Sequence, residues 1–127
     1  MNRLLFLFFV VLSFVALKSC AEAQVNEQAI AEVAAGKMTE AKASWWGFNE
    51  TDATACLQKA MDSKVPKLVV DNVGKPWVVT PLKLVSNQGI VFEKDVEVLA
   101  KAGEFKGSQD SLFTGSLVEN VTLSGYG

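Results

Sequence analysis

The sequence has 127 residues with 12 basic and 14 acidic side chains, a formal net charge of −2 at pH 7, and no histidine. It contains no block of basic residues, which argues against nucleic acid as a partner and against electrostatic attraction to membranes. The absence of histidine excludes Ser-His-Asp and Cys-His nucleophile systems and most zinc or copper sites. Any chemistry would therefore depend on carboxylates, Lys, Arg, Tyr or backbone groups.

The N-terminal segment 1–23 is typical of a secretory signal peptide. Arg3 precedes an almost unbroken apolar run over 4–17, whose length suits a signal peptide and is short for a membrane span. Ala21–Ala23 supplies a small-x-small cleavage pattern. We therefore expect a secreted or periplasmic protein that has no membrane span after cleavage.

The two cysteines allow an alternative. Leu17–Cys20 resembles the lipobox of bacterial lipoproteins, with Cys20 as the lipidated residue, although Lys18 departs from that pattern. With cleavage after position 23, Cys56 is the one cysteine left, so no intrachain disulfide is expected. We predict that Cys56 is a small buried hydrophobe without thiol reactivity.

The segment 24–43 is expected to hold a short helix and a polar connector. Small apolar residues occur at helical spacing over 24–35, and Gly36 suits the position just after a helix. The residues that follow are polar, and they predict no further element before position 44.

A second helix is predicted over 52–63. Its apolar residues share one face, at i, i+3, i+4, i+7 and i+8: Ala53, Cys56, Leu57, Ala60 and Met61. Asn49 or Thr51 can act as its N-cap, and Pro66 prevents its continuation.

After Pro66 the hydrophobic period changes from 3.6 to 2. Short β-rich runs occupy 67–72, 77–80, 82–86, 89–94, 96–102, 112–118 and 120–125. Turn signals separate them and no helix intervenes, which excludes a βαβ sheet and leaves a sandwich, a barrel or a β-solenoid. Asn87 and Asn120 each stand near the start of an apolar-x-apolar triplet, a weak sign of a repeat.

Three stretches resemble a known family: "TDATACLQKAMD" (51–62), "PLKLVSNQGIVFEKDVEVLA" (81–100) and "NVTLSGYG" (120–127). They are similar to the N-terminal part of right-handed parallel β-helix proteins of the pectate-lyase-like superfamily, which includes polygalacturonase-type glycoside hydrolases. The resemblance implies an all-β fold over 44–127. It would be the first coils of a right-handed parallel β-helix capped by the amphipathic helix over 52–63, truncated at the C-terminus.

In such a fold the helix would close one end of the core. Leu57 and Met61 would plug that end, and five residues would line the interior of the coils: Val69, Ile90, Phe92, Val121 and Leu123. The complete small β-sandwich remains an alternative, and it would show antiparallel strands in two sheets.

The resemblance implies a secreted, carbohydrate-active protein, either a polysaccharide lyase or a glycoside hydrolase acting on an acidic polysaccharide. None of the family's catalytic residues has a counterpart here, so we expect no catalytic site and no cofactor in this chain, with Ca²⁺ implied only for the parent protein. The expected partners are a polysaccharide or glycan and the remaining coils of the parent. The alternative function is a non-catalytic glycan-binding or surface scaffold.

Trp45, Trp46 and Trp77 are the candidate carbohydrate-binding residues, because aromatic faces can stack on sugar rings. The favoured interpretation is structural: the first two would pack over the helix and Trp77 would anchor the first coil, since large aromatic residues are mostly buried.

Acidic residues form two further groups. Glu93, Asp95 and Glu97 alternate and would share one face of a strand, where carboxylates could serve glycoside hydrolysis or bind Ca²⁺. Glu104 and Asp110 flank the longest loop. For both groups a solvated turn or loop is the favoured interpretation, since charged residues are mostly exposed.

Overall fold

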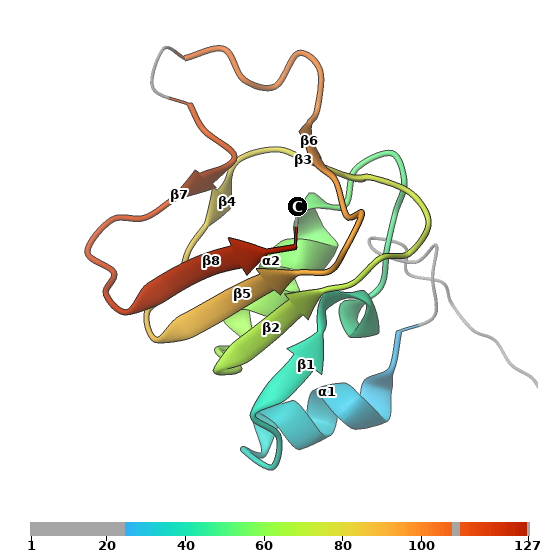
Figure 1. The fold of residues 1–127 in the computed structure, drawn as a ribbon, viewed down its shortest axis with the longest axis vertical. Coiled ribbons are helices and arrows are strands. Elements are labelled where there is room, and N and C mark those ends of the chain that lie inside the picture. Colours follow the sequence, from blue (N-terminus) through green and yellow to red (C-terminus); the bar gives the residue numbers. More distant parts are fainter. Residues whose placement is uncertain (1–24, 108–109, 127) are drawn as a thin grey trace, which may run out of the picture.

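The computed structural model describes residues 25–107 and 110–126. The predicted signal peptide, including Cys20, lies outside these residues. The elements are, in chain order, α1 (Glu27–Ala34), β1 (Glu40–Lys42), the 3₁₀ helix η2 (Ala43–Trp46), α2 (Thr54–Asp62), β2 (Lys67–Val70), β3 (Trp77–Val79), β4 (Leu82–Lys83), β5 (Gln88–Phe92), β6 (Val98–Ala100), β7 (Phe113–Thr114) and β8 (Val121–Gly125) (Figure 1).

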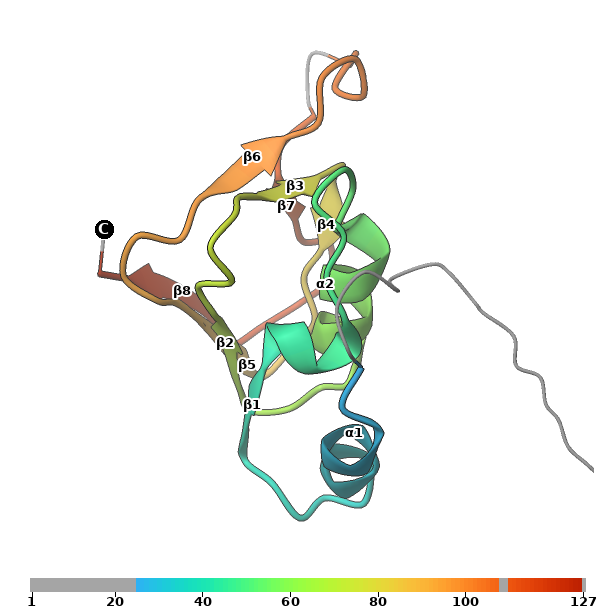
Figure 2. The same ribbon diagram turned by 90° about the vertical axis from the view of Figure 1, so that its right-hand side faces the viewer.

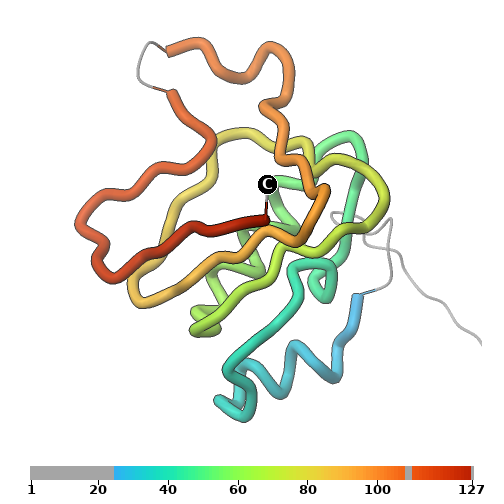
Figure 3. Tube along the Cα trace, in the orientation of Figure 1, coloured from blue at the N-terminus to red at the C-terminus, as the bar shows by residue number. Residues whose placement is uncertain are grey.

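The strands form three short sheets in which every pair is parallel. The largest has the order β1-β2-β5-β8, and the others are the pairs β3-β6 and β4-β7. In the four-stranded sheet the chain returns three times to a position beside its own earlier segment, so that β2 lies next to β1, β5 next to β2 and β8 next to β5 (Figure 3). Both α-helices lie on the same side of the four-stranded sheet (Figure 2).

The prediction of an all-β, right-handed parallel β-helix over 44–127 is wrong. The described residues form a small mixed arrangement of helices and short parallel sheets, and no closed or solenoid β-helix is found among them. Two of the sheets hold only one pair of strands, and β4 and β7 have two residues each. The parallel pairing also removes the alternative of an antiparallel β-sandwich, at least for residues 25–107 and 110–126.

The helices begin and end where local chemistry permits. Asn26 caps α1, because its Oδ1 accepts from the backbone N–H of Ala29 at 3.0 Å, and Gly36 follows the helix with a φ of 76°. The helix predicted over 52–63 is present as α2. Its predicted cap is wrong: Asn49 Oδ1 accepts within its own loop, and Asp52 Oδ1 accepts from the Thr54 N–H at 3.0 Å.

Side chains of helix α2 form hydrogen bonds with one edge of each two-stranded sheet, β3-β6 and β4-β7. The Thr80 N–H, just after β3, donates to Thr54 Oγ1 at 2.8 Å. In β4, the Lys83 N–H donates to Gln58 Oε1 at 2.9 Å, and Gln58 Nε2 donates back to the Lys83 carbonyl at 3.0 Å. Side chains of α2 thus take the place of a neighbouring strand, which satisfies backbone groups that would otherwise be unpaired.

The core lies between α2 and the sheets. Leu57 and Met61 of α2 are fully buried against Leu68, Trp77 and Ile90 from the strands. Of the five predicted interior residues, only two are buried, Ile90 and Val69; Phe92 and Val121 are half-buried and Leu123 is 45% exposed. Burial therefore decreases from β2 through β5 to β8.

Two further findings concern Cys56 and the lengths of the helices. Cys56 is disulfide-bonded, so the expectation that it forms no disulfide is wrong, although the side chain is fully buried as expected. Within the described part of the chain, no helix is long and apolar enough to span a bilayer.

Candidate functional site

A cavity of about 430 Å³ lies between the two α-helices, and we call it the helix groove. Its lining comes from three elements, α1, η2 and α2: Ile30, Ala34, Trp46, Lys59, Asp62 and Ser63. The position of η2 between α1 and α2 (Figure 2) explains how residues distant in sequence meet here. The groove is thus built by the docking of α1 onto η2.

Local sequence explains that docking. The Asn26 N–H donates to the Trp45 carbonyl at 2.8 Å, which joins the start of α1 to η2. Ala29 and Val33 form the buried side of α1. The small side chain of Ala34, one residue beyond Val33, lines the groove and leaves space for it.

The polar groups of the helix groove differ in the hydrogen bonds and ion pairs that they form. Asp62 Oδ1 accepts from Gln58 Nε2 at 3.0 Å, and the Ser63 hydroxyl donates to the Ala60 carbonyl at 2.6 Å. Lys59 is exposed, and across residues 25–107 and 110–126 it takes part in no ion pair. The groove therefore has a mainly apolar lining with one cation, Lys59, and one carboxylate, Asp62, which can accept further hydrogen bonds.

The three tryptophans do not form one surface. Trp77 is fully buried, its Nε1–H donates to the Asp71 carbonyl at 3.0 Å, and its ring meets Phe48 edge to face at 4.9 Å between centroids. Trp45 and Trp46 are neighbours, with centroids 6.5 Å apart and planes tilted by 31°. Of the three, Trp46 lines the helix groove, although it is 7% exposed and belongs to the core, and Trp45 is half-buried against the core.

Glu93, Asp95 and Glu97 lie around one cavity. Glu93 Oε1 accepts from the Asn72 N–H at 2.8 Å, which ties two neighbouring turns. All three residues line a second cavity of about 410 Å³ next to Gly125. No group of three or more potential metal ligands occurs in the part of the chain that the structure describes.

The loop carboxylates lie apart from these. Asp110 Oδ2 accepts from the Gly107 N–H at 2.9 Å, so this side chain closes a turn in its own loop. Glu104 is exposed in the same loop. Nothing in this arrangement builds a site from Glu104 and Asp110.

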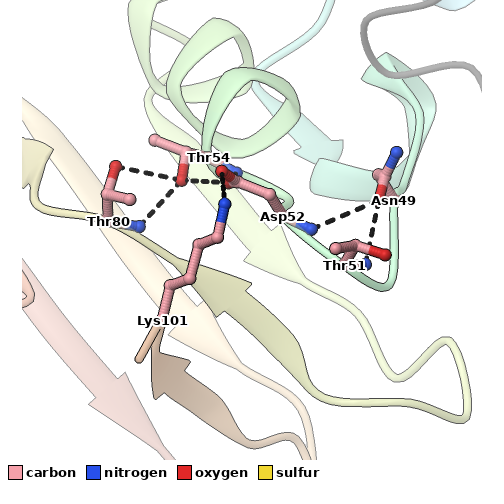
Figure 4. A network of polar contacts seen from close by, with 6 residues as sticks. All are labelled: Asn49, Thr51, Asp52, Thr54, Thr80 and Lys101. Atoms are coloured by element: carbon pink, nitrogen blue, oxygen red, sulfur yellow. Dashed lines mark hydrogen bonds and ion pairs between the residues drawn. The ribbon is translucent and has the colours of Figure 1, made fainter. Parts of the chain in front are cut away.

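A polar network that sequence reasoning missed lies at the start of α2 (Figure 4). Asp52 accepts from the Thr54 N–H at 3.0 Å, from the Thr54 hydroxyl at 2.5 Å, and from Lys101 Nζ at 3.0 Å. The Thr54 hydroxyl also accepts from Thr80. Partial burial of Asp52 opposes ionisation, yet the hydrogen bonds from Thr54 and the charge of Lys101 together hold the pKa of Asp52 below its ordinary value.

Asp52→Asn is expected to lower the free energy of unfolding by about 1 kcal/mol at pH 7, because the carboxylate accepts three hydrogen bonds. A lowered folded-state pKa contributes stability that is present above the unfolded-state value, about 3.9, and is lost as the pH falls through the folded-state value. The difference between Asp52→Asn and wild type should therefore shrink below about pH 4. Urea unfolding from pH 2.5 to 7 measures it, and a difference independent of pH would contradict this role for Asp52.

Comparison of the chain with protein-family models, curated proteins and solved structures finds no match. The functional interpretation therefore rests on the geometry of the helix groove and on the sequence resemblance.

Proposed function

We propose that this chain is a glycan-binding part of a secreted, carbohydrate-active protein, and that the helix groove binds an acidic sugar without cleaving it. The observation that carries this proposal is the presence of Trp46 and Lys59 in one cavity. The resemblance to carbohydrate-active proteins supports the same class of ligand.

The groove has the size and chemistry that a sugar requires. Its volume of about 430 Å³ lies within the range of small-molecule sites, which combine a mostly apolar lining with a few polar groups. Trp46 is 7% exposed, so it offers a sugar only the small apolar part of its indole that lines the groove. The ammonium of Lys59 can pair with a uronate carboxylate, and Asp62 can accept from sugar hydroxyl groups.

The same lining argues for binding over hydrolysis. Glycoside hydrolysis by the usual mechanisms needs two carboxylates on either side of the scissile bond. Asp62 is the single carboxylate in the helix groove, and it already accepts a hydrogen bond from Gln58. We therefore expect the chain to bind an acidic oligosaccharide and to leave its chain length unchanged.

Lys59→Gln is expected to weaken binding of an oligogalacturonide by about tenfold or more, because a charge-assisted contact is lost. Isothermal titration calorimetry on the full chain measures this with an oligogalacturonide and with a neutral oligosaccharide of similar length. Lys106→Gln is the matched control, since it removes the same charge from an exposed loop outside the groove.

Three results would contradict the proposal: no binding by wild type, equal losses in the Lys59 and Lys106 variants, or shortening of the oligosaccharide during the titration. Equal losses would mean that net charge, and not the groove, governs the affinity.

A further inference from the structure

The segment 25–38, which contains α1, has little polar attachment to the other described residues. Among residues 25–107 and 110–126, a single hydrogen bond joins it to them, from the Asn26 N–H to the Trp45 carbonyl at 2.8 Å. Glu27 and Glu32 of α1 take part in no ion pair within the same ranges. Helix α2, in contrast, is joined by side-chain hydrogen bonds to the end of β3, to β4 and to β5.

The apolar attachment of α1 is also small. Of its eight residues, Ala29 and Val33 are the two buried ones, at 8% and 7% exposed. Ile30 packs on the core but is only partly buried. A helix shorter than about 12–15 residues is marginal in water without tertiary packing. Segments with few buried apolar contacts unfold locally while the rest of a protein stays folded, and α1 has these features.

The docked form of α1 depends on the glycine that follows the helix. Gly36 has a φ of 76°, and its N–H donates to the Val33 carbonyl at 3.0 Å. The Lys37 N–H donates to the Glu32 carbonyl at 3.0 Å. These two bonds form a Schellman motif, which ends a helix at a left-handed residue. A Cβ at position 36 would meet no atom within 4 Å, so a substitution there acts on the backbone conformation alone.

Local unfolding of α1 would remove one wall of the helix groove. Ile30 and Ala34 supply that wall, and α1 packs on η2, which carries Trp46. With α1 docked, Trp46 is 7% exposed, so most of its indole is covered. Lys59 and Asp62 belong to α2 and stay in place when α1 unfolds. The open groove would present more of the indole beside the same cation and carboxylate.

We propose that α1 is a lid on the helix groove, which opens by local unfolding of α1 while the rest of the described chain stays folded, and that the acidic sugar binds the open form. The sugar part of this inference rests on the proposed function, whereas the opening of α1 does not. A ligand that binds only an open form has an apparent affinity reduced by the fraction of molecules that are open. Changes that favour opening therefore strengthen binding.

Amide hydrogen exchange of the full chain without sugar tests the opening. We expect the hydrogen-bonded amides of α1 to exchange at least about tenfold faster than those of α2. Gly36→Ala should raise exchange in α1 by about a further tenfold and leave α2 unchanged, because a side chain disfavours the left-handed conformation. Gly74→Ala is the matched control: Gly74 has a φ of 87°, no atom lies within 4 Å of its added Cβ, and it lies outside the groove. Exchange of α1 and α2 at one common rate overturns the lid.

Calorimetric titration with an oligogalacturonide tests the link to binding. Gly36→Ala should bind up to about tenfold more tightly than wild type, because a larger fraction of molecules is open. Gly74→Ala should bind like wild type. Unchanged or weaker binding by Gly36→Ala, or equal strengthening in both variants, overturns the proposal that the sugar selects the open form. Absence of binding by wild type contradicts the proposed function and the sugar part together, and the exchange rates then decide the lid alone.

Discussion

Trp77→Ala is expected to lower the free energy of unfolding by about 3–5 kcal/mol, the range measured for removal of a large buried aromatic side chain. Trp77 is fully buried at the start of β3, where it packs edge to face on Phe48. Its Nε1–H donates to the Asp71 carbonyl, so truncation also leaves a buried acceptor unpaired. For a chain of this size, such a loss is a large fraction of the total stability.

Trp77→Phe separates the two contributions. It retains an aromatic ring against Phe48 and removes the hydrogen bond to Asp71, so we expect a smaller loss, about 1–3 kcal/mol. Chemical denaturation followed by far-UV circular dichroism measures both variants. If Trp77→Ala unfolded with a midpoint close to that of wild type, Trp77 would not anchor the core.

Gln88→Glu is expected to cost about 3 kcal/mol or more at pH 7, because it places an ionised group in a buried site without a counter-ion. Gln88 is 1% exposed, and its Nε2 donates to the carbonyls of Met61 and Val65 at 3.1 and 3.0 Å. These two bonds join β5 to the end of α2 and the turn after it. A carboxylate oxygen in place of the amide Nε2 would face the carbonyl oxygens of Met61 and Val65, and neither side could donate a hydrogen bond.

The pH dependence distinguishes this mechanism from simple loss of packing. Burial raises the pKa of a carboxyl group at position 88, so the folded state binds a proton more tightly than the unfolded state. The stability so gained is complete below the unfolded value, about 4.3, and is lost as the pH rises through the folded value. The free energy of unfolding of Gln88→Glu should therefore increase at low pH relative to that of Gln88→Leu. Parallel curves for the two variants from pH 3 to 8 would contradict the assignment.

Local sequence patterns located most of the helices and strands. The stripe at Ala53, Leu57 and Met61 predicted α2 because three-to-four spacing is specific for one helix face. β1 was missed, since its single buried side chain, Ala41, is too small to mark a strand and its pairing with β2 is a tertiary effect. The cap of α2 was misassigned because several polar residues precede it and only the fold selects among them.

Which face of a strand is buried was harder to predict. The run at 67–70 has no alternation after Lys67, and Leu68, Val69 and Val70 are all buried, so periodicity gives no basis for choosing between the faces. The aligned partner of Ile90 is Leu68, whereas the predicted interior set contained Val69. The closure of the coils was likewise inferred from resemblance, and short strands alone do not determine how sheets close.

The candidate site was predictable only in part. The sequence identified Trp46 by residue type, but its two neighbours in the groove, Ile30 and Lys59, come from separate helices whose docking no local pattern encodes. Trp77 has the same residue type and is fully buried, whereas Trp46, at 7% exposed, still lines the groove. Residue type therefore predicted a class of ligand, and only the packing of α1 on η2 indicated which tryptophan lines a cavity.

The central claim is that the helix groove binds an acidic sugar. It is tested most directly by titrating ¹⁵N-labelled full chain with an oligogalacturonide and following the assigned indole and backbone N–H signals. We expect saturable shifts at Trp46 and at the groove residues of α1 and α2, with the Trp77 indole unchanged, and their loss in Lys59→Gln. Shifts spread evenly over the lysine-bearing surface, or confined to residues outside the groove, would contradict the claim.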